Sequence, residues 1–510
     1  MAKNLFNSIK LSKPKSSNFD LTHDVKLSCN MGKLVPVMLM ECVPGDNVRI
    51  GGDALVRFAP MVAPVMQRMD VSIHYFFVPN RLLWPKWPEF ITGAGIAAGT
   101  PLPLHPYIDV NSSSYTKLMD YFGIPEAPVG YSEKVSALPF AAYQSIYNQY
   151  YADQNLIPNA HADNAGNVPC VDGDNTANTW LYQLQTRAWA HDYFTAALPF
   201  AQKGPAVDMP SVEVNAPVLA NYSSDGNMHW PTTNPPGFDL QVEHHGVNPD
   251  YSVGQLFVDT KRDGSVTAPT INDLRIAEKV QQWLERNARA GTRLVESILG
   301  HFGVRSSDKR LDRPEYIVGV KSPVVISEVL NTTGTDELPQ GNMAGHGISV
   351  TTGNFGKYFC EEHGFIVGIM SVMPQAAYMQ GISRHFNRFN SNDYYWPSFA
   401  HLGEQAVFLK ELYAFTANSD KEFGYVPRYA EYKYMPSRVA GDFRDQLDYW
   451  HLARRFDGEP LLNKEFIECD VDETTRIFAV EDPDVDHLYC HVLNKVYARR
   501  LMPKFGTPML

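Results

Sequence analysis

Apolar side chains alternate with more polar ones between Met69 and Val78, in the segment MDVSIHYFFV. This period of two residues predicts a β-strand. One face of the strand is wholly apolar, with Val71, Ile73, Tyr75 and Phe77. The other face is only half polar, with Ser72, His74, Phe76 and Val78. A strand of this kind needs cover on both faces, and its own pattern does not say what supplies the second cover.

Further strand-like segments occur towards both ends of the chain. Between about Cys29 and Val78, short apolar runs are broken by turn signals such as VPGDN and FVPNR. Such runs return after residue 314 as PEYIVGV, PVVISEVL and GFIVGIMSVM. Closely spaced strands with Gly and Pro between them are typical of an all-β sandwich or barrel. We therefore expect one domain, a sandwich elaborated by long insertions, rather than a string of domains.

Three segments have helical spacing. Residues 138–156, LPFAAYQSIYNQYYADQNL, place aromatic rings three and four positions apart, and residues 186–200, TRAWAHDYFTAALPF, do so more weakly. The clearest helix is INDLRIAEKVQQWLERNARAG, in which Leu274, Ala277, Val280 or Gln281, and Leu284 share a stripe. We expect Asn272 or Asp273 to cap it, Glu285 and Arg289 to pair, and Gly291 to end it.

Residues 211–268 have no helical or strand period. They hold ten Gly or Pro residues and a net charge of -5, together with aromatic residues such as Tyr222, Trp230, Phe238, Tyr251 and Phe257. A structureless stretch of this length is unusual inside a compact domain, and this one has too many rings for a solvated linker. We expect a folded excursion with a small core of its own.

Composition excludes several classes of protein. The 510 residues carry a net charge of -12, which disfavours a dedicated nucleic-acid binder. No run of apolar residues is long enough to span a membrane, and the basic N-terminus lacks the apolar stretch of a secretory signal. The six cysteines never form a CxxC pair, and we expect reduced, buried thiols at Cys29, Cys42, Cys170, Cys360, Cys469 and Cys490.

Catalytic and metal-binding patterns are weak in this sequence. The phosphate-loop, GxSxG and HExxH motifs are absent. The segment from Asp172 resembles the start of a calcium loop but has Ala177 and Gln183 where the loop requires Gly and Glu. The acidic segments CDVDE and EDPDVDH favour solvated loops over a cation site at a subunit contact, and His244 and His245 favour a surface or contact role. We expect no catalytic residue, no metal site and no cofactor.

Both ends of the chain are basic. The candidate phosphate-contacting residues are Lys3, Lys10, Lys13, Lys15, Arg499, Arg500 and Lys504. Taken alone, either end serves equally well as a solubilising tail or as a partner for local carboxylates. If both ends lie on one surface, that surface can face phosphates in a salt-sensitive contact that does not depend on base sequence.

The segment PGDNVRIGGDALVRFAPMVAPVMQRMDVSIHYFFVPNRLLWPKWPEFITG resembles the N-terminal signature of the major capsid protein of the Microviridae, and in particular of their gokushovirus branch. Further segments are similar to the same family and run in its order: LPFAAYQSIYNQYYADQNL, TRAWAHDYFTAALPFAQKG, LERNARAGTRLVESILGHFGVRSSDKRLDRPEYIVG, PVVISEVL, PQGNMAGHG, EEHGFIVGIMSVMPQAAYMQG and RFNSNDYYWPSFAHLGEQA. The resemblance covers most of the chain and is weakest at residues 155–178 and 211–268.

The resemblance implies an eight-stranded antiparallel jelly roll of the viral capsid type. Sixty copies would meet at five-, three- and two-fold axes in a T=1 icosahedral shell around circular single-stranded DNA, in a virion assembled in the bacterial cytoplasm. The implied partners are the DNA, a small basic internal DNA-binding protein, a DNA pilot protein and a receptor on the bacterial surface. Residues 211–268 are expected to form the three-fold protrusion that attaches to the host, with Tyr222, Trp230, Phe238, His244, His245 and Tyr251.

The predicted organisation follows from these segments. A basic arm occupies residues 1–28, and the first strands with inserted loops and helices occupy 29–210. The insertion follows at 211–268, and a helix, the remaining strands and a basic tail occupy 269–510. In such a subunit, the second face of the strand at 69–78 is covered by the insertions or by a neighbouring subunit. A secreted carbohydrate-active β-sandwich enzyme and a simple host-recognition module are the alternatives.

Overall fold

The computed structural model describes residues 15–93, 101–157, 162–163, 166–205, 207, 213–215, 218–220, 256–258, 265–267, 270–291, 293–330, 343–353, 355–480, 482 and 484–505. The chain divides into two compact units by its internal contacts. The larger unit comprises Met1–Ala201 and Ala288–Leu510, and the smaller one Gln202–Asn287.

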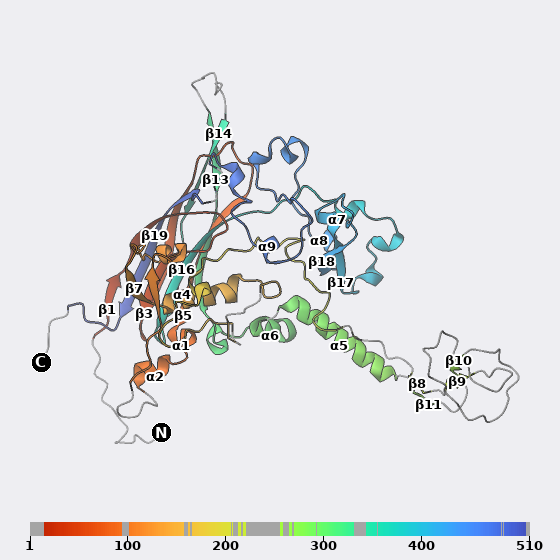
Figure 1. Ribbon diagram of the computed structural model, residues 1–510, viewed down its shortest axis with the longest axis horizontal. Coiled ribbons are helices and arrows are strands. Elements are labelled where there is room, and N and C mark those ends of the chain that lie inside the picture. The colour runs from red at the N-terminus through yellow and green to blue at the C-terminus, as the bar shows by residue number, and fades with distance from the viewer. Residues whose placement is uncertain are drawn as a thin grey trace, which may run out of the picture. The chain divides into compact units, whose positions relative to one another are not determined.

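The larger unit is mainly β and contains two antiparallel sheets that pack as a sandwich (Figure 1). One sheet has the order β1-β19-β4-β14-β13, with β2 also paired to β19 and β15 to β4. Its strands are β1 (Ser17–Asp20), β2 (His23–Cys29), β4 (Asn47–Phe58), β13 (Val325–Leu330), β14 (Met343–Thr351), β15 (Gly356–Phe359) and β19 (Leu488–Arg500). The other sheet has the order β12-β5-β16-β3, with β3 (Val35–Cys42), β5 (Met69–Pro79), β12 (Glu315–Pro323) and β16 (Gly364–Pro374).

The core of the sandwich follows from alternation along its central strands. β19 pairs with β4 over twelve positions, from Leu488 opposite Phe58 to Arg499 opposite Asn47. Every second residue of β19 from Leu488 to Ala498 is buried, and these side chains pack with those of β3, β5 and β16 between the sheets. Removing this apolar surface from water stabilises the fold by about 25 cal/mol for each Å² that is buried.

The strand at residues 69–78 is confirmed as β5, and both of its faces are buried except at Asp70 and His74, which are partly exposed. Tyr75 and Phe77 lie in the core between the sheets. Phe76 and Val78 lie in a second core, built by segments inserted between the strands. The ring centroid of Phe76 is 4.7 Å from that of Tyr150, which comes from the insertion after β7. The chain's own insertions therefore cover the second face at these positions, so no neighbouring subunit is needed there.

The helix predicted from residue 138 is confirmed in part. α4 (Leu138–Ile146) continues into a π-helical turn, η2 (Tyr147–Tyr151). The second prediction, a helix over 186–200, is wrong. The backbone N–H of Arg187 donates to Gly32, that of Trp189 donates to Ile467, and the carbonyl of Arg187 accepts from Cys469. The segment is extended at this point because its hydrogen bonds are made to distant parts of the chain.

The remaining elements of the larger unit are short and decorate the sandwich. Two hairpins are formed by β6 (Tyr107–Asn111) with β7 (Ser132–Ser136) and by β17 (Glu404–Phe408) with β18 (Glu422–Pro427). The other α-helices are α1 (Asn80–Leu83), α2 (Trp87–Thr92), α3 (Lys117–Tyr121), α6 (Leu294–Phe302), α7 (Leu409–Leu412), α8 (Ala430–Lys433) and α9 (Lys464–Ile467). The 3₁₀ turns are Thr179–Tyr182, Asp308–Leu311, Arg384–Phe386, Ser391–Asp393, Pro397–Phe399, Gly441–Arg444, Asp448–Trp450 and Thr475–Ile477.

The long helix α5 (Ile271–Ala290) is confirmed, but two details of its prediction are wrong. Its first turn is closed by Thr270, whose hydroxyl accepts from the Asp273 N–H at 3.2 Å while the Asp273 carboxylate accepts from the Thr270 N–H at 2.8 Å. Arg289 pairs with Glu404 of β17, and Glu285 accepts a hydrogen bond from Gln281 instead. Gly291, at a φ of 103°, follows the last residue of the helix as expected.

Two short strand pairs are described within the predicted excursion. β8 (Glu213–Asn215) pairs with β11 (Ser265–Thr267), and β9 (Val218–Ala220) pairs with β10 (Leu256–Val258). The small core predicted for this segment lies outside the described residues. All six cysteines are buried and free, as predicted. Among the described residues, no helix combines the length and the apolar character needed to cross a membrane.

Candidate assembly and genome-contact surfaces

The two basic ends of the chain meet on the larger sheet. β1 pairs with the end of β19, with Ser17 opposite Arg500 and Asn18 opposite Arg499. Lys15 precedes β1 and is exposed, and the Nε of Arg499 donates to Ser16 at 3.1 Å. Lys504 is also exposed beyond β19. The fold therefore brings together side chains that are almost five hundred positions apart in the sequence.

Arg500 differs from its neighbours because a carboxylate neutralises its charge. Its Nε lies 3.2 Å from the carboxylate of Asp46, which is fully buried, and its guanidinium also donates to the Glu41 carbonyl at 2.7 Å. Arg500 thus pairs with a nearby carboxylate. This is one of the two roles that the sequence allowed for a basic end taken alone. Lys15 and Arg499 have no such partner among the described residues.

The other predicted site residues all lie outside the described residues: Lys3, Lys10, Lys13, Tyr222, Trp230, Phe238, His244, His245 and Tyr251. The calcium-like segment is described, and its Asp172 accepts from the Trp84 indole at 2.8 Å and from Lys86 at 2.6 Å. Its carboxylate is thus used to anchor the start of the insertion after β5.

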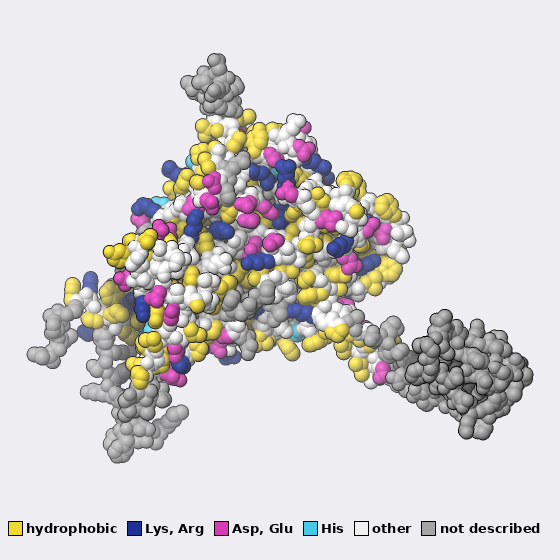
Figure 2. Space-filling model, viewed as in Figure 1, with side chains coloured by type: hydrophobic (Ala, Val, Ile, Leu, Met, Phe, Trp, Pro, Cys, Tyr) yellow, Lys and Arg dark blue, Asp and Glu magenta, His cyan; other side chains and the backbone are white. Residues whose placement is uncertain are grey.

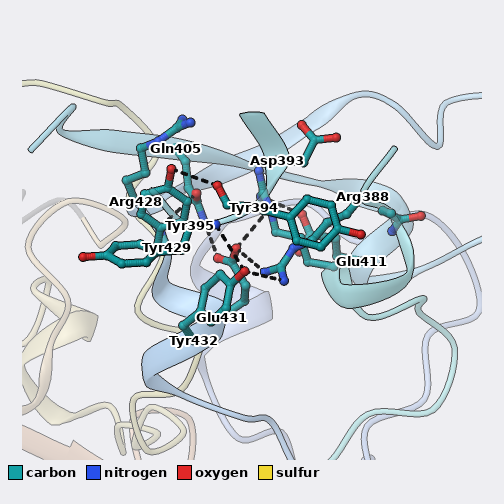
Figure 3. Close-up of polar contacts among 12 residues, drawn as sticks. Arg388, Asp393, Tyr394, Tyr395, Gln405, Glu411, Arg428, Tyr429, Glu431 and Tyr432 are labelled. Atoms are coloured by element: carbon teal, nitrogen blue, oxygen red, sulfur yellow. Dashed lines mark hydrogen bonds and ion pairs between the residues drawn. The ribbon is translucent and has the colours of Figure 1, made fainter. Parts of the chain in front are cut away.

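A buried ion-pair cluster lies beside the hairpin of β17 and β18, and sequence reasoning missed it. Two carboxylates are almost fully buried, with side-chain exposures of 2% for Glu411 and 6% for Glu431. Arg384 donates to Glu411 at 3.1 Å, and Arg388 donates to Glu431 at 2.8 Å. Figure 3 shows the Arg388 guanidinium joined by dashed lines to Glu431 and to Tyr432. Each buried charge in this cluster has a partner of opposite sign.

The two carboxylates respond differently to burial. Burial raises the pKa of Glu411 above its ordinary value, against the opposing effect of Arg384 and of the hydrogen bond from Tyr193 at 3.0 Å. Burial also acts on Glu431, but the hydrogen bonds from Gln405 and Arg388 outweigh it, so the pKa of Glu431 is lowered. The Glu431 carboxylate is therefore firmly ionised, and Arg388 is held in place.

The cluster fixes a loop that carries exposed rings. The Arg388 guanidinium lies 4.2 Å from the ring centroid of Tyr432 and 5.7 Å from that of Tyr394. We call the adjoining exposed rings the aromatic loop surface: Phe386, Phe389, Tyr394, Tyr395 and Trp396. Phe386 and Phe389 are 71% and 83% exposed. Figure 2 shows hydrophobic side chains mixed with charged ones over the part of the larger unit that carries β17 and β18.

Rigidly held, water-exposed rings are typical of a surface that contacts other protein molecules. An antiparallel β-sandwich that holds such a surface in place with buried ion pairs has the features of a structural subunit. The chain matches the family model described as "Capsid protein (F protein)" over residues 7–510. It therefore belongs to this family of phage capsid proteins.

Three relatives cover nearly the whole chain. Capsid protein VP1 of Chlamydia phage 1 is 34% identical over 591 residues, which span 100% of this chain and 98% of that protein. Capsid protein VP1 of Bdellovibrio phage phiMH2K is 36% identical over 96% of this chain and 95% of that protein. Capsid protein VP1 of Spiroplasma virus 4 is 29% identical over 97% of this chain and 95% of that protein.

These comparisons confirm the resemblance to the microvirus capsid proteins. The chain is a structural component of a phage virion, where copies of the protein form a shell around the genome. The alternative of a secreted carbohydrate-active enzyme is wrong, because the members of this family are structural capsid proteins.

Proposed function

We propose that sixty copies of this protein form a T=1 icosahedral shell around a circular single-stranded DNA genome. The observation that supports this proposal is the aromatic loop surface of this chain, which belongs to a family of capsid proteins. Rings exposed on one subunit lose their contact with water when subunits meet, and aromatic residues are enriched at such interfaces. Obligate interfaces commonly bury more than about 2,000 Å² and are the more hydrophobic kind.

We further propose that eight strands of the sandwich form a jelly roll. The strands β2, β19, β4 and β14 are neighbours in one sheet, and β3, β16, β5 and β12 are neighbours in the other. Along the chain, successive members of this set change sheet at every step except between β5 and β12. Two four-stranded sheets connected in this way support the double Greek key arrangement of a jelly roll.

The basic ends are proposed to face the genome. Lys15, Arg499 and Lys504 leave positive charge near the paired strands β1 and β19, and Lys3, Lys10 and Lys13 extend this charge along the preceding chain. The whole chain carries a net charge of -12 and cannot neutralise a genome alone. We therefore keep a small basic internal protein as a proposed partner, together with a DNA pilot protein.

Assembly is tested by expressing the full chain and examining it by size-exclusion chromatography and electron microscopy. We expect particles or five-fold assemblies. The double variant Phe386→Ser/Phe389→Ser should keep the thermal unfolding midpoint of the single chain and lose assembly, because it removes apolar contact surface only between molecules. A stable monomer of the unmodified chain under all conditions would contradict the proposal. If the double variant still assembles, the contact between subunits does not lie at the aromatic loop surface.

The insertion is proposed to form the three-fold protrusion that binds a receptor on the bacterial host. Deleting residues 211–268 should leave shells that form but attach poorly to cells, measured by particle counts after adsorption. Loss of assembly would show that the insertion is structural.

The basic arm is tested separately, by replacing Lys3, Lys10, Lys13 and Lys15 with Gln. We expect reduced DNA content or particle stability, and full packaging with unchanged stability at low and high salt would count against an inward-facing arm.

A further inference from the structure

A pocket of about 400 Å³ lies on the face of the smaller sheet that points away from the sandwich. Its floor is formed by β5 and its neighbours, with Ser72, His74 and Tyr316. The π-helical turn η2 contributes Tyr151, and the extended segment at 187–191 contributes Arg187. A volume between 300 and 1,000 Å³ with several aromatic side chains and a few polar groups in its walls is typical of a site for a small organic group. Turns of the π type also occur frequently at functional sites.

The unusual feature of this pocket is the Arg187 guanidinium. Its Nη1 donates to the hydroxyls of Ser72 and Ser371, both at 2.6 Å. The described residues place no carboxylate in ion-pair contact with it. The nearby carboxylate of Asp70 pairs with Lys321 at 2.9 Å and lies 3.9 Å from Arg68. Charged groups removed from water normally have a partner of opposite sign, so this guanidinium leaves positive charge available to an anion.

The walls of the pocket offer flat rings next to this charge. Tyr316 is 48% exposed, and its ring centroid lies 6.1 Å from that of His74. His74 stacks on Tyr151 at 6.0 Å and shares a hydrogen bond of 2.8 Å with its hydroxyl. Gly319 lets both rings lie close to the sheet, because a Cβ there would lie 2.4 Å from the Tyr316 hydroxyl and 2.6 Å from the His74 ring. The exposed half of the Tyr316 ring remains accessible. A planar group can therefore lie against Tyr316.

We propose that this pocket binds one nucleotide unit of the enclosed single strand, with a phosphate oxygen at Arg187 and the base against Tyr316. The inference rests on the proposed function, which supplies a polymer that carries one phosphate and one base in each unit. Base stacking on an aromatic ring does not depend on which base is present, and every phosphate can bind a guanidinium. The pocket thus suits repeated contacts of a shell with a genome of arbitrary sequence.

Two variants of the full-length chain test the pocket. The probe is a fluorescein-labelled oligothymidylate, and its affinity is measured by fluorescence anisotropy at several salt concentrations. Arg187→Met should weaken binding about tenfold and lower the slope of log K against log salt by about 0.7. Tyr316→Ala should weaken binding at least about fivefold with an unchanged slope. Arg187→Met should not lower the unfolding midpoint, because Ser72 and Ser371 remain bonded to each other at 3.1 Å. Tyr316→Ala removes a half-buried ring that packs on His74, so its affinity is measured well below its own unfolding midpoint.

Matched controls exclude general effects of charge and of ring loss. Arg455→Gln removes a guanidinium that is already paired with Asp448 at 3.0 Å, and Tyr131→Ala removes a ring that is 71% exposed in the insertion before β7. Both controls should bind the oligonucleotide like the unmodified chain. In particles that contain DNA, ultraviolet crosslinking followed by mass spectrometry should attach nucleotides to peptides that carry Tyr151, Trp189 or Tyr316.

Unchanged affinity in both pocket variants would overturn the inference, even if particles still form and package DNA. If Arg187→Met leaves oligonucleotide binding intact but weakens the particle, the pocket holds a carboxylate of another protein molecule, and the inference also fails. Failure of the unmodified chain to form any particle would instead contradict the proposed function, so the two failures are distinguishable.

Discussion

Arg388 and Arg187 are both largely buried arginines of the same unit, yet their surroundings differ in one respect. Arg388 is 7% exposed and faces the ionised Glu431, with Arg384 and Glu411 beside it. Arg187 faces two serine hydroxyls and the rings of a pocket, with no carboxylate in contact among the described residues. A paired charge fixes local structure, whereas an unpaired one reduces stability and is available to a ligand. The two regions therefore respond in opposite ways to the loss of the arginine.

The largest effect is expected at Arg388. Arg388→Gln leaves the Glu431 carboxylate buried with Gln405 and with Arg384 at 4.0 Å, and it should lower the free energy of unfolding by about 3 kcal/mol. Urea unfolding of the unassembled chain measures this loss. The double variant Arg388→Gln/Glu431→Gln should recover part of it, because it removes the stranded charge. If the double variant instead loses as much free energy of unfolding as the two single variants together, Arg388 and Glu431 are not coupled.

The next effect concerns the pH dependence at the pocket. Burial, with a smaller contribution from the charge of Arg187, lowers the pKa of His74 from 6.5 to about 4. The other charged or titratable groups that line the pocket are Asp70, Tyr150, Tyr151, His191, Tyr316 and Lys321. Because the unfolded chain takes up a proton near pH 6.5 and the folded chain only near pH 4, His74 contributes stability above pH 6.5 that is lost as the pH falls towards 4.

This loss amounts to about 3 kcal/mol between those two pH values. The measurement is urea unfolding of the unmodified chain and of His74→Gln across this range, since the difference between them removes the contribution of Glu411 and other carboxylates. The advantage of the unmodified chain should shrink as the pH falls. A constant difference from pH 7 to pH 4 would show that His74 titrates normally in the folded chain.

A smaller effect of opposite sign is expected at Arg187. Arg187→Met should raise the free energy of unfolding by up to about 1 kcal/mol, because an uncompensated charge leaves the protein while both serines keep a partner. Thermal unfolding of the unassembled chain, without DNA, measures the change. A loss of more than about 1 kcal/mol would place Arg187 with Arg388, as a residue whose main role is to hold the fold together.

The smallest effect is expected at an exposed ion pair. Lys86 and Asp172 lie 2.6 Å apart, but their side chains are 51% and 34% exposed. Lys86→Gln should leave the free energy of unfolding almost unchanged, because solvent screens such a pair and the Trp84 indole still donates to Asp172. The same urea experiment as for Arg388 measures it. A loss of stability as large as that of Arg388→Gln would mean that burial does not decide how much an ion pair contributes to the stability of this protein.

Elements whose pattern is local could be predicted from the sequence. The prediction was wrong where contacts with distant residues determine the conformation of a segment. The two faces of β5 were predictable, because alternation is visible in ten consecutive residues. The helix expected at 186–200 did not form, because its backbone groups pair with residues near 32 and 467. The capping of α5 differs from the prediction for another reason. Thr270 stands three residues before Asp273, which is a capping signal visible in the sequence, but Asn272 and Asp273 are equally good capping residues by type.

The difference between Arg187 and Arg388 could not be predicted from the sequence. Arg388 finds Glu431 forty-three positions later. Arg187 has Asp192 only five positions away, but that carboxylate accepts hydrogen bonds from Thr195 and from the Tyr378 hydroxyl at 2.6 Å. Charge pairing inside a fold depends on where side chains meet in space, so spacing along the chain says little about it. The meeting of the two basic ends on β1 and β19 was left open by the sequence for the same reason.

The position of β19 has a consequence for biosynthesis. This strand is the last in chain order, yet it lies between β4 and both β1 and β2 in its sheet. A ribosome releases β19 only after every other described strand has emerged, and contacts between segments this far apart in sequence form slowly. The growing polypeptide thus lacks the middle of one sheet until translation reaches residues 488–500. Until then β4 has an unpaired edge on that side, so each copy completes its sandwich only once this strand has been made.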